Sequence, residues 1–406
     1  MKAVNPKELH VSIDVGCYFH SVAVGLANGT YLGKFEISHN KSGFQNFFKR
    51  IEEYKKQSNG EVSVAMEGYN GHARPLDKMV QAKNYKLLNI NNLKLARFKE
   101  IFPAPAKTDV IDSRKGLELF QLQQIIPAAK NVLQKVYESP QENIELKCVT
   151  RKRKRLVNER TRYLNSLHAD LTSVSPGLVD ITGKMKNVWF MNFLASSKKL
   201  SQLANKSKKT LLNIPWVGQT KVKKILVWQK QAVFSKDEPF MSSLIHLDIA
   251  RINELGTLIS QLDKRVLELN EKSNIAKRLI SIKGFGVSSC GELAGEIGNI
   301  QRFKKEASLA VYLGMAPLDN NSGNSTGIKK SKNVNSHAKA AMMSAVDKHR
   351  IYIEESKLYY EKKRNEGKKH NQAIRSLGRH MVRVVFKMLT LDRDYQIVIP
   401  IKKGEP

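Results

Sequence analysis

Four acidic residues in the N-terminal part of the chain have the chemistry and positions of a metal-binding site. Asp109 and Asp112 are three residues apart, which puts both carboxylates on one face of a helix about one turn apart. Two like charges this close repel, so they favour a helix only when a cation lies between them. Asp14 and Glu67 each follow a short apolar segment that predicts a β-strand. Four carboxylates from two strand ends and one helical turn predict a hard-oxygen site for Mg²⁺ or Mn²⁺.

The acids also have a simpler interpretation. Asp109 and Asp112 could merely begin a helix, where acidic side chains interact favourably with the helix dipole. The presence of Asp14 and Glu67 at two strand ends favours the metal site over that interpretation. Asp77, which is acidic and close in sequence, is predicted to be an exposed helix residue.

The segments around the acids predict an α/β domain. A three-stranded meander with a hairpin turn at Asn28-Gly29 precedes alternating helices and strands, which is the element order of the ribonuclease H-like fold. In that fold the acids of the first and fourth strands are neighbours at the sheet centre, and a late helix supplies the rest. The predicted strands are 9–15, 21–27, 31–37, 62–66 and 86–90, and the predicted helices are 42–56, 75–82, 93–101 and 109–123.

From about residue 139 the pattern becomes helical. A long helix is predicted from Pro140 to about residue 174, with an apolar seam on one side and a basic run on the other. A second helix at about 242–272 has apolar residues three and four apart, typical of a coiled coil that could pair within the chain or between protomers. Residues 177–210 are lysine-rich and weakly patterned, so we make no prediction for them. The basic run, predicted to contact nucleic-acid phosphates, is Arg151, Lys152, Arg153, Lys154 and Arg155.

Two short segments, 214–225 and 282–293, read as an apolar residue, a turn and a helix, which is the pattern of a helix-hairpin-helix. Glycine in such a turn lets backbone N–H groups approach a phosphate at the helix N-terminus. Gly284 and Gly286 fit this role, whereas the first segment has Trp216 where glycine is usual.

A polar, glycine-rich loop at residues 319–327 contains Ser322. Such composition usually means a turn, and a serine hydroxyl is a poor nucleophile unless a base or a metal takes its proton. Lys329 and Lys330 follow the loop and could hold a phosphate near Ser322, although ordinary surface lysines would look the same. Two basic helices are predicted to finish the chain, at 336–360 and 371–391, and the three tryptophans are predicted to lie in the core: Trp189, Trp216 and Trp228.

Composition sets the class of partner. The 69 Lys and Arg against 37 Asp and Glu give a net charge of +32, which predicts a nucleic acid partner. The three cysteines are too far apart in sequence for a disulfide framework or a zinc site. No apolar run approaches the roughly 20 residues needed to cross a bilayer, so a cytosolic protein without membrane contact is predicted. Three domains are predicted, at residues 1–138, 139–275 and 276–406.

At this point the chain resembles the DEDD transposases of bridge-RNA-guided insertion sequences, also described as serine-type RNA-guided DNA recombinases. The matching segments occur in the family's order and cover nearly the whole chain. They are Ser-Ile-Asp14-Val-Gly, Ala-Met-Glu67-Gly, Lys-Thr-Asp109-x-x-Asp112, the basic run, Ile-Lys-Gly-Phe-Gly, and Tyr-Leu-Gly-Met-Ala-Pro followed by Ser322-Gly.

The resemblance implies a RuvC-like N-terminal domain, a coiled coil and a C-terminal transposase domain that carries a serine. It implies a composite site, in which the four acids of one protomer bind metal while Ser322 of another attacks DNA and forms a 5′-phosphoserine link. Because Ser325 lies in the same loop, the assignment to Ser322 depends on the Ser-Gly match. A noncoding bridge RNA would pair with donor and target DNA, and a dimer would assemble into a synaptic tetramer.

Two other functions are consistent with the residues. A metal-dependent structure-selective nuclease, resembling a Holliday-junction resolvase, would use water as the nucleophile, and Ser322 would then be only a loop residue. A basic nucleic-acid-binding scaffold with a decayed nuclease fold would need none of the acids. The four intact acids argue against the scaffold, and the C-terminal domain argues against a simple resolvase.

Overall fold

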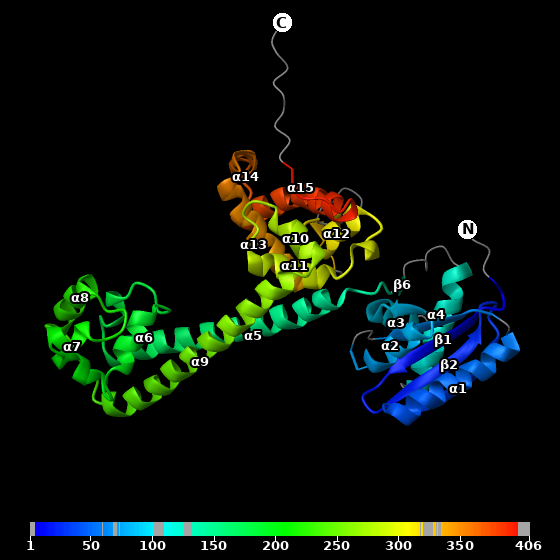
Figure 1. Cartoon of the computed structure of the whole chain (residues 1–406), viewed down its shortest axis with the longest axis horizontal. Coiled ribbons are helices and arrows are strands. Elements are labelled where there is room, and N and C mark those ends of the chain that lie inside the picture. The colour runs from blue at the N-terminus through cyan, green and yellow to red at the C-terminus, as the bar shows by residue number, and fades with distance from the viewer. Residues whose placement is uncertain are drawn as a thin grey trace, which may run out of the picture. The chain divides into compact units, whose positions relative to one another are not determined.

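The structure is a computed structural model that divides into two compact units, residues 1–138 and 139–406 (Figure 1). It describes residues 5–58, 60–67, 71–72, 74–100, 109–125, 132–316, 318–319, 328–329, 331 and 334–396. No helix within these ranges is both long and apolar enough to cross a membrane.

The first unit is built on a six-stranded mixed sheet with strand order β3-β2-β1-β4-β5-β6. β1 pairs in parallel with β4, and β4 with β5, while the other neighbouring strands are antiparallel. The prediction of an α/β sheet domain is therefore confirmed, although the short last strand was not predicted. The strands are β1 (Leu9–Val15), β2 (Phe19–Leu26), β3 (Tyr31–Ser38), β4 (Val62–Glu67), β5 (Lys86–Ile90) and β6 (Leu133–Lys135).

Helices cover both faces of this sheet. Alternate residues of β1 point to opposite sides, and each set packs against a different helix. Leu9, Val11 and Ile13 pack in one core cluster with Phe47 of α1. His10, on the opposite face, stacks on Phe120 of α4 with ring centroids 3.8 Å apart. The helices of the first unit are α1 (Lys41–Ser58), α2 (Arg74–Ala82), α3 (Asn92–Lys99) and α4 (Asp109–Ile125).

Asp77 corrects one prediction. Its side chain is only 3 % exposed, so the expectation of an exposed helix residue is wrong. The residue lies between Leu76 and Val80 on the face of α2 that packs into the core cluster of the sheet.

The second unit is almost entirely helical and is organised around two long antiparallel helices, α5 (Gln141–Val174) and α9 (Glu238–Asn270). Leu146 packs with Val266, and Leu156 packs with Leu255, so the two helices run in opposite directions. The seam predicted on α9 therefore pairs with α5 of the same chain, which answers a question that the sequence left open.

Short helices form a second core cluster at one end of the α5–α9 pair (Figure 1). Most of them occupy the lysine-rich segment 177–210, for which we made no prediction, and the last is the helix of the predicted segment 214–225. Trp189 and Trp228 are buried here as predicted, whereas Trp216 is 75 % exposed, and the prediction that it lies in the core is wrong. These elements are η2 (Val179–Ile181), α6 (Val188–Ala195), η3 (Leu200–Asn205), α7 (Lys208–Leu212) and α8 (Gln219–Gln229).

The other end of the pair carries a third cluster, built by the C-terminal helices (Figure 1). The single helix predicted at 336–360 is wrong, because the backbone is extended at Ile353 and divides it in two. The elements are α10 (Asn274–Ile280), α11 (Val287–Ile297), η4 (Ile300–Arg302), α12 (Glu306–Tyr312), β7 (Leu318–Asp319), β8 (Ile328–Lys329), α13 (Ser336–Tyr352), α14 (Glu354–Asn365) and α15 (His370–Thr390).

Candidate active site

The parallel pairing of β1 and β4 brings two of the predicted acids together. Ile13 is opposite Met66, so Asp14 and Glu67 occupy the next matching positions on neighbouring strands. Strands in a sheet lie about 4.8 Å apart, and side chains at matched positions of parallel strands point to the same face. Asp14 and Glu67 are therefore neighbours on one face of the sheet.

Helix α4 covers that same face and brings Asp112 toward it. Phe120 stacks on His10, and a Cβ added at Gly116 would lie 2.3 Å from Oγ of Ser12. Residues four apart on α4 thus meet residues two apart on β1, since one helical turn and two strand residues have similar lengths. Continuing this register by one turn puts Asp112 of α4 at the level of Asp14.

A cation from the protein itself contacts Asp112. Nζ of Lys99 lies 2.8 Å from Oδ2 of Asp112, and both side chains are largely covered. Asp109 is the first residue of α4, and its side chain is outside the described part of the structure. Among the described side chains, no three His, Cys, Asp or Glu groups lie close enough together to hold a metal ion.

The predicted acids have the type of side chain that binds a hard cation. Asp14, Glu67 and Asp112 offer carboxylate oxygens from the sheet and from the helix that covers it, and such oxygens are the ligands that Mg²⁺ prefers. The ion pair of Asp112 with Lys99 shows that this carboxylate already lies opposite a positive charge.

One further acid lies in the same row of residues across the sheet. Asp14 is opposite Ser21 of β2, and Ser21 is opposite Glu36 of β3, so all three share a face with Glu67. The hydroxyl of Ser21 donates a hydrogen bond of 3.4 Å to Glu36. Glu36 was not among the predicted acids, because only the strand register relates it to Asp14.

A pair of histidines occupies the same end of the sheet. His20 is opposite Val15, and its Nε2 lies 2.9 Å from Nδ1 of His39. Burial, together with the nearby His39 and His72, lowers the pKa of His20 to about 4. His20 is therefore neutral in the folded protein at pH 7.

Lowering the pH from 7.5 to 5 should destabilise the first unit by up to ~2 kcal/mol through His20. The folded-state pKa lies below the unfolded value, so the unfolded state takes up the proton first. The stability linked to neutral His20 is complete above about pH 6.5 and is lost as the pH falls towards 4. Amide hydrogen exchange of β1 and β2 in the full chain measures this loss. His20→Gln should flatten the pH dependence, and an unchanged slope in the variant would contradict the assignment.

The predicted serine lies in the other unit. β7 and β8 form an antiparallel ribbon with Asp319 opposite Ile328, and the segment that connects them contains Ser322. Ser322 and Lys330 lie outside the described residues, and the side chain of Lys329 is also not described.

The predicted basic run divides into two kinds of residue. Arg151 makes two hydrogen bonds to the carboxylate of Glu296, at 2.6 and 2.9 Å, and Arg153 makes an ion pair with Asp263. Lys152 and Arg155 are exposed. Arg151 and Arg153 thus face the protein, whereas the side chains of Lys152 and Arg155 face solvent.

Glu296 is buried, and its neighbours keep its carboxyl group charged. Burial raises the pKa of its carboxyl, but the hydrogen bonds from Arg151 and Asn335 and the charge of Lys147 outweigh burial and hold that pKa below its usual value. The amide of Asn335 donates at 2.8 Å to the same carboxylate. Glu296 therefore joins α5, α11 and the start of α13.

The two glycines of the second hairpin have different surroundings. Gly284 has a φ of +92°, and a Cβ added there would meet the backbone of His349 in α13 at 2.7 Å. Gly286 caps α11, and no atom lies within 4 Å of an added Cβ. Packing against α13 thus accounts for Gly284, while the helix end at Gly286 is open.

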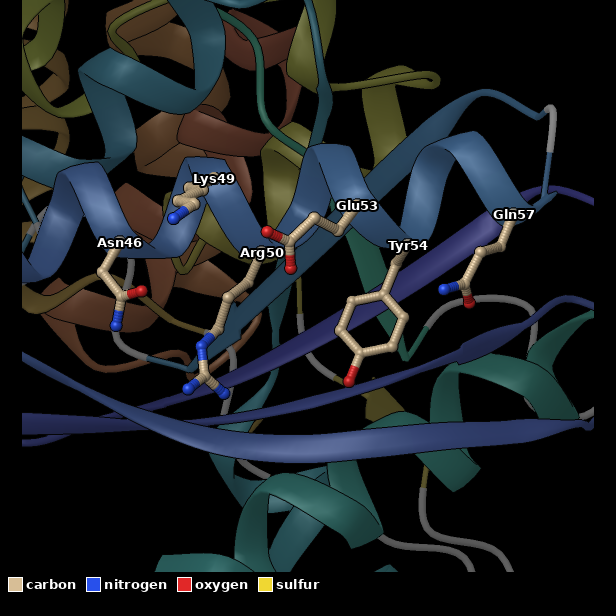
Figure 2. A pocket seen from close by; sticks show the side chains of 6 residues that line it. All are labelled: Asn46, Lys49, Arg50, Glu53, Tyr54 and Gln57. Atoms are coloured by element: carbon tan, nitrogen blue, oxygen red, sulfur yellow. The ribbon is translucent and has the colours of Figure 1, made fainter.

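A hollow elsewhere on the first unit lacks the features of a catalytic site. Figure 2 shows its six lining side chains along one face of α1, among them Lys49, Arg50 and Glu53. It contains a single carboxylate and none of the predicted acids.

Comparison with known proteins assigns this arrangement to a class. A family model described as a transposase, of the DEDD type found in IS110 elements, matches residues 11–176, which include all four acids. A second model, described as the transposase IS116/IS110/IS902 family, matches residues 276–361, which include Ser322. The chain is a DNA transposase.

Relatives agree with this class. A 44.8 kDa protein of insertion element IS116 from Streptomyces clavuligerus is 26 % identical over 63 % of this chain and 65 % of its own length. A 43.6 kDa protein of insertion element IS110 from Streptomyces coelicolor is 24 % identical over 78 % of each chain. A 42 kDa protein of insertion element IS900 from Mycobacterium paratuberculosis is 32 % identical over 36 % of each. The chain belongs to the IS110/IS116 family of transposases.

Proposed function

We propose that this transposase cuts and rejoins the DNA of an insertion sequence through metal-binding acids and a serine nucleophile. The acids are Asp14, Glu67, Asp109 and Asp112 in a RuvC-like domain, and the nucleophile is Ser322. The observation that carries the proposal is the register that makes Asp14 and Glu67 neighbours beneath α4, which carries Asp112 in its first turn.

The acids would hold Mg²⁺ or Mn²⁺, which when bound stabilises negative charge on phosphate oxygens. Lys99 then has a defined role, because it neutralises Asp112 when no other cation does. The hydroxyl oxygen of Ser322 would attack phosphorus, forming the Oγ–P bond while the P–O3′ bond breaks and the 3′ oxygen takes a proton. The product is a 5′-phosphoserine link and a free 3′-hydroxyl, and reversal on another strand rejoins DNA without an external energy source.

A covalent-trapping assay tests the serine. The protein is incubated with Mg²⁺, its RNA and end-labelled DNA that carries the element junction, and is then denatured. We expect a protein–DNA adduct in the wild type that disappears in Ser322→Ala, while Ser325→Ala retains it. Cleavage without an adduct, unaffected by Ser322→Ala but lost in Asp14→Asn, would instead identify a hydrolytic nuclease. Nucleic acid binding without any cleavage would identify a scaffold.

Gly116→Ala should slow cleavage roughly ten- to hundredfold, although it removes no acid. The added methyl group would meet Oγ of Ser12 at 2.3 Å and so displace α4, which carries Asp112, from β1. Cleavage rates on the junction DNA measure the effect. Ser12→Ala in the same chain removes the clashing oxygen and should restore most of the rate. A slow double variant would show that Gly116 acts in another way.

Guidance by a bridge RNA and a dimer that forms a tetramer belong to the same proposal. Because the α9 seam is used within the chain, contacts between protomers need another surface. The exposed Phe240, Leu244 and Leu247 form an apolar stripe on α9 that could supply one. Analytical ultracentrifugation with and without RNA tests this part, and a monomer under all conditions would contradict it.

A further inference from the structure

The hairpin between α7 and α8 has the same backbone as the hairpin between α10 and α11. The N–H of Val217 donates to the carbonyl of Ile214 at 3.1 Å, and the N–H of Phe285 donates to that of Ile282 at 3.0 Å. Between them lies a left-handed residue in each turn, Trp216 with φ of +67° and Gly284 with φ of +92°. A glycine follows two residues later in each turn and caps the next helix.

The shared geometry serves different purposes in the two turns. Gly284 is packed directly against the backbone of α13. Trp216 is 75 % exposed at the equivalent position. A bulky side chain in the left-handed region is strained, and an exposed indole gains nothing from burial, so neither folding nor packing accounts for this residue.

The segment of the chain around Trp216 carries only positive charges. From Ile181 to Lys236, both included, it has 12 lysines and no arginine, aspartate or glutamate. The lysines of α7 and those in the middle of α8 are exposed: Lys208, Lys209, Lys223 and Lys224.

Lys221 holds the turn in place. Its ammonium group donates at 2.8 Å to the carbonyl of Trp216 and lies 5.4 Å from the ring centroid of buried Trp189. The indole is thus presented from a fixed backbone, which lowers the entropy lost when it binds a partner.

We propose that Trp216 stacks on an unpaired base of a DNA strand while the lysines of α7 and α8 contact the flanking phosphates. Flat aromatic side chains among cations are the usual means of holding single strands, whereas a closed duplex hides the faces of its bases. The inference rests on the proposed strand cleavage and exchange, which supply unpaired bases. This surface lies in residues 177–275, which neither family model matches.

Tryptophan fluorescence of the full chain tests the proposal, because Trp216 is exposed while Trp189 and Trp228 are buried. Titration with a 12-mer of oligothymidine should quench the emission, and this quenching should weaken with added salt. A blunt duplex of the same length should quench much less. Equal quenching by the duplex, or quenching only by the matching oligouridine, would overturn the assignment to unpaired DNA.

Two substitutions separate binding from folding. Trp216→Gly relieves the backbone strain, so it should fold at least as stably as the wild type and yet bind the 12-mer about tenfold more weakly. Binding of the Trp216→Gly and Trp216→Phe variants is followed by anisotropy of labelled DNA. Trp216→Phe keeps an aromatic face and should retain most of the affinity. Unchanged affinity in Trp216→Gly would refute the stacking role.

The catalytic proposal can fail independently. Asp14→Asn should bind the 12-mer as the wild type does, because it leaves the second unit unchanged. If Ser322→Ala still forms the adduct while Trp216→Gly loses affinity, the catalytic assignment fails and the stacking surface stands. If Ser322→Ala loses the adduct while Trp216→Gly keeps its affinity, the catalytic assignment stands and the stacking role fails.

Discussion

Asp14→Asn should abolish DNA cleavage while leaving DNA binding nearly unchanged. Asparagine keeps the shape of the side chain but removes the negative charge beside Glu67 on the neighbouring strand. We expect the cleavage rate to fall roughly a thousandfold or more, because a lost metal ligand removes several kcal/mol of charge stabilisation. Binding should persist, since the substitution makes a net charge of +32 more positive by one. Cleavage of end-labelled junction DNA and fluorescence anisotropy measure the two properties.

Glu53→Gln is the matched control for this experiment. Glu53 is an exposed carboxylate on α1, in the hollow of Figure 2, and its removal changes the net charge equally. It should cleave at the wild-type rate. An equal fall in both variants, or a loss of DNA binding in Asp14→Asn, would count against the acid site.

Arg151→Met should destabilise the second unit by ~3 kcal/mol, because it leaves the carboxylate of Glu296 buried without its main partner. Glu296 has no exposed surface in its side chain, and Arg151 supplies two of its hydrogen bonds. A loss of this size lowers the melting temperature by roughly 6–12 °C. Calorimetry of the full chain measures the change.

The pH dependence of this loss identifies its cause. Without Arg151 the pKa of Glu296 rises above the unfolded value, so the penalty is full at neutral pH and shrinks as Glu296 takes up a proton. The difference from the wild type should therefore be smaller at pH 5 than at pH 8. Lys152→Met is the control, since Lys152 is the adjacent, exposed residue of the basic run. It should leave stability unchanged and weaken DNA binding. Equal melting temperatures of the two variants would disprove the role of Glu296.

Much of the first unit could be predicted because its signals are local. Alternating apolar segments and the Asn28-Gly29 turn located five of the six described strands, and the acids stood out at strand ends. The pairing of Asp14 with Glu67 and of Ser21 with Glu36 depends on strand register. Register arises from contacts between segments that are distant in sequence, so Glu36 could not be selected in advance.

The errors arose where tertiary contacts override residue type. Asp77 has the polarity of a surface residue but lies on the packed face of α2, and Trp216 has the apolarity of a core residue but lies at an exposed turn. The basic run gave no sign that Arg151 serves Glu296, which is 145 residues away. The composition indicates the kind of molecule that this protein binds. It does not indicate which side chains contact one another in the fold.

The antiparallel pairing of α5 and α9 also determines the order in which the second unit can assemble. All of α5 is synthesised before α9, so its apolar face has no partner until the intervening helices have emerged. Contacts near the Trp189 cluster, such as Leu167 with Ile245, close a loop of roughly 80 residues, whereas Leu146 and Val266 close one of roughly 120. The shorter loop and the dense core around it favour a folding nucleus at the core cluster that contains Trp189 and Trp228. We therefore expect the two helices to pair from this end towards α11, and the buried pair of Arg151 and Glu296 to form late.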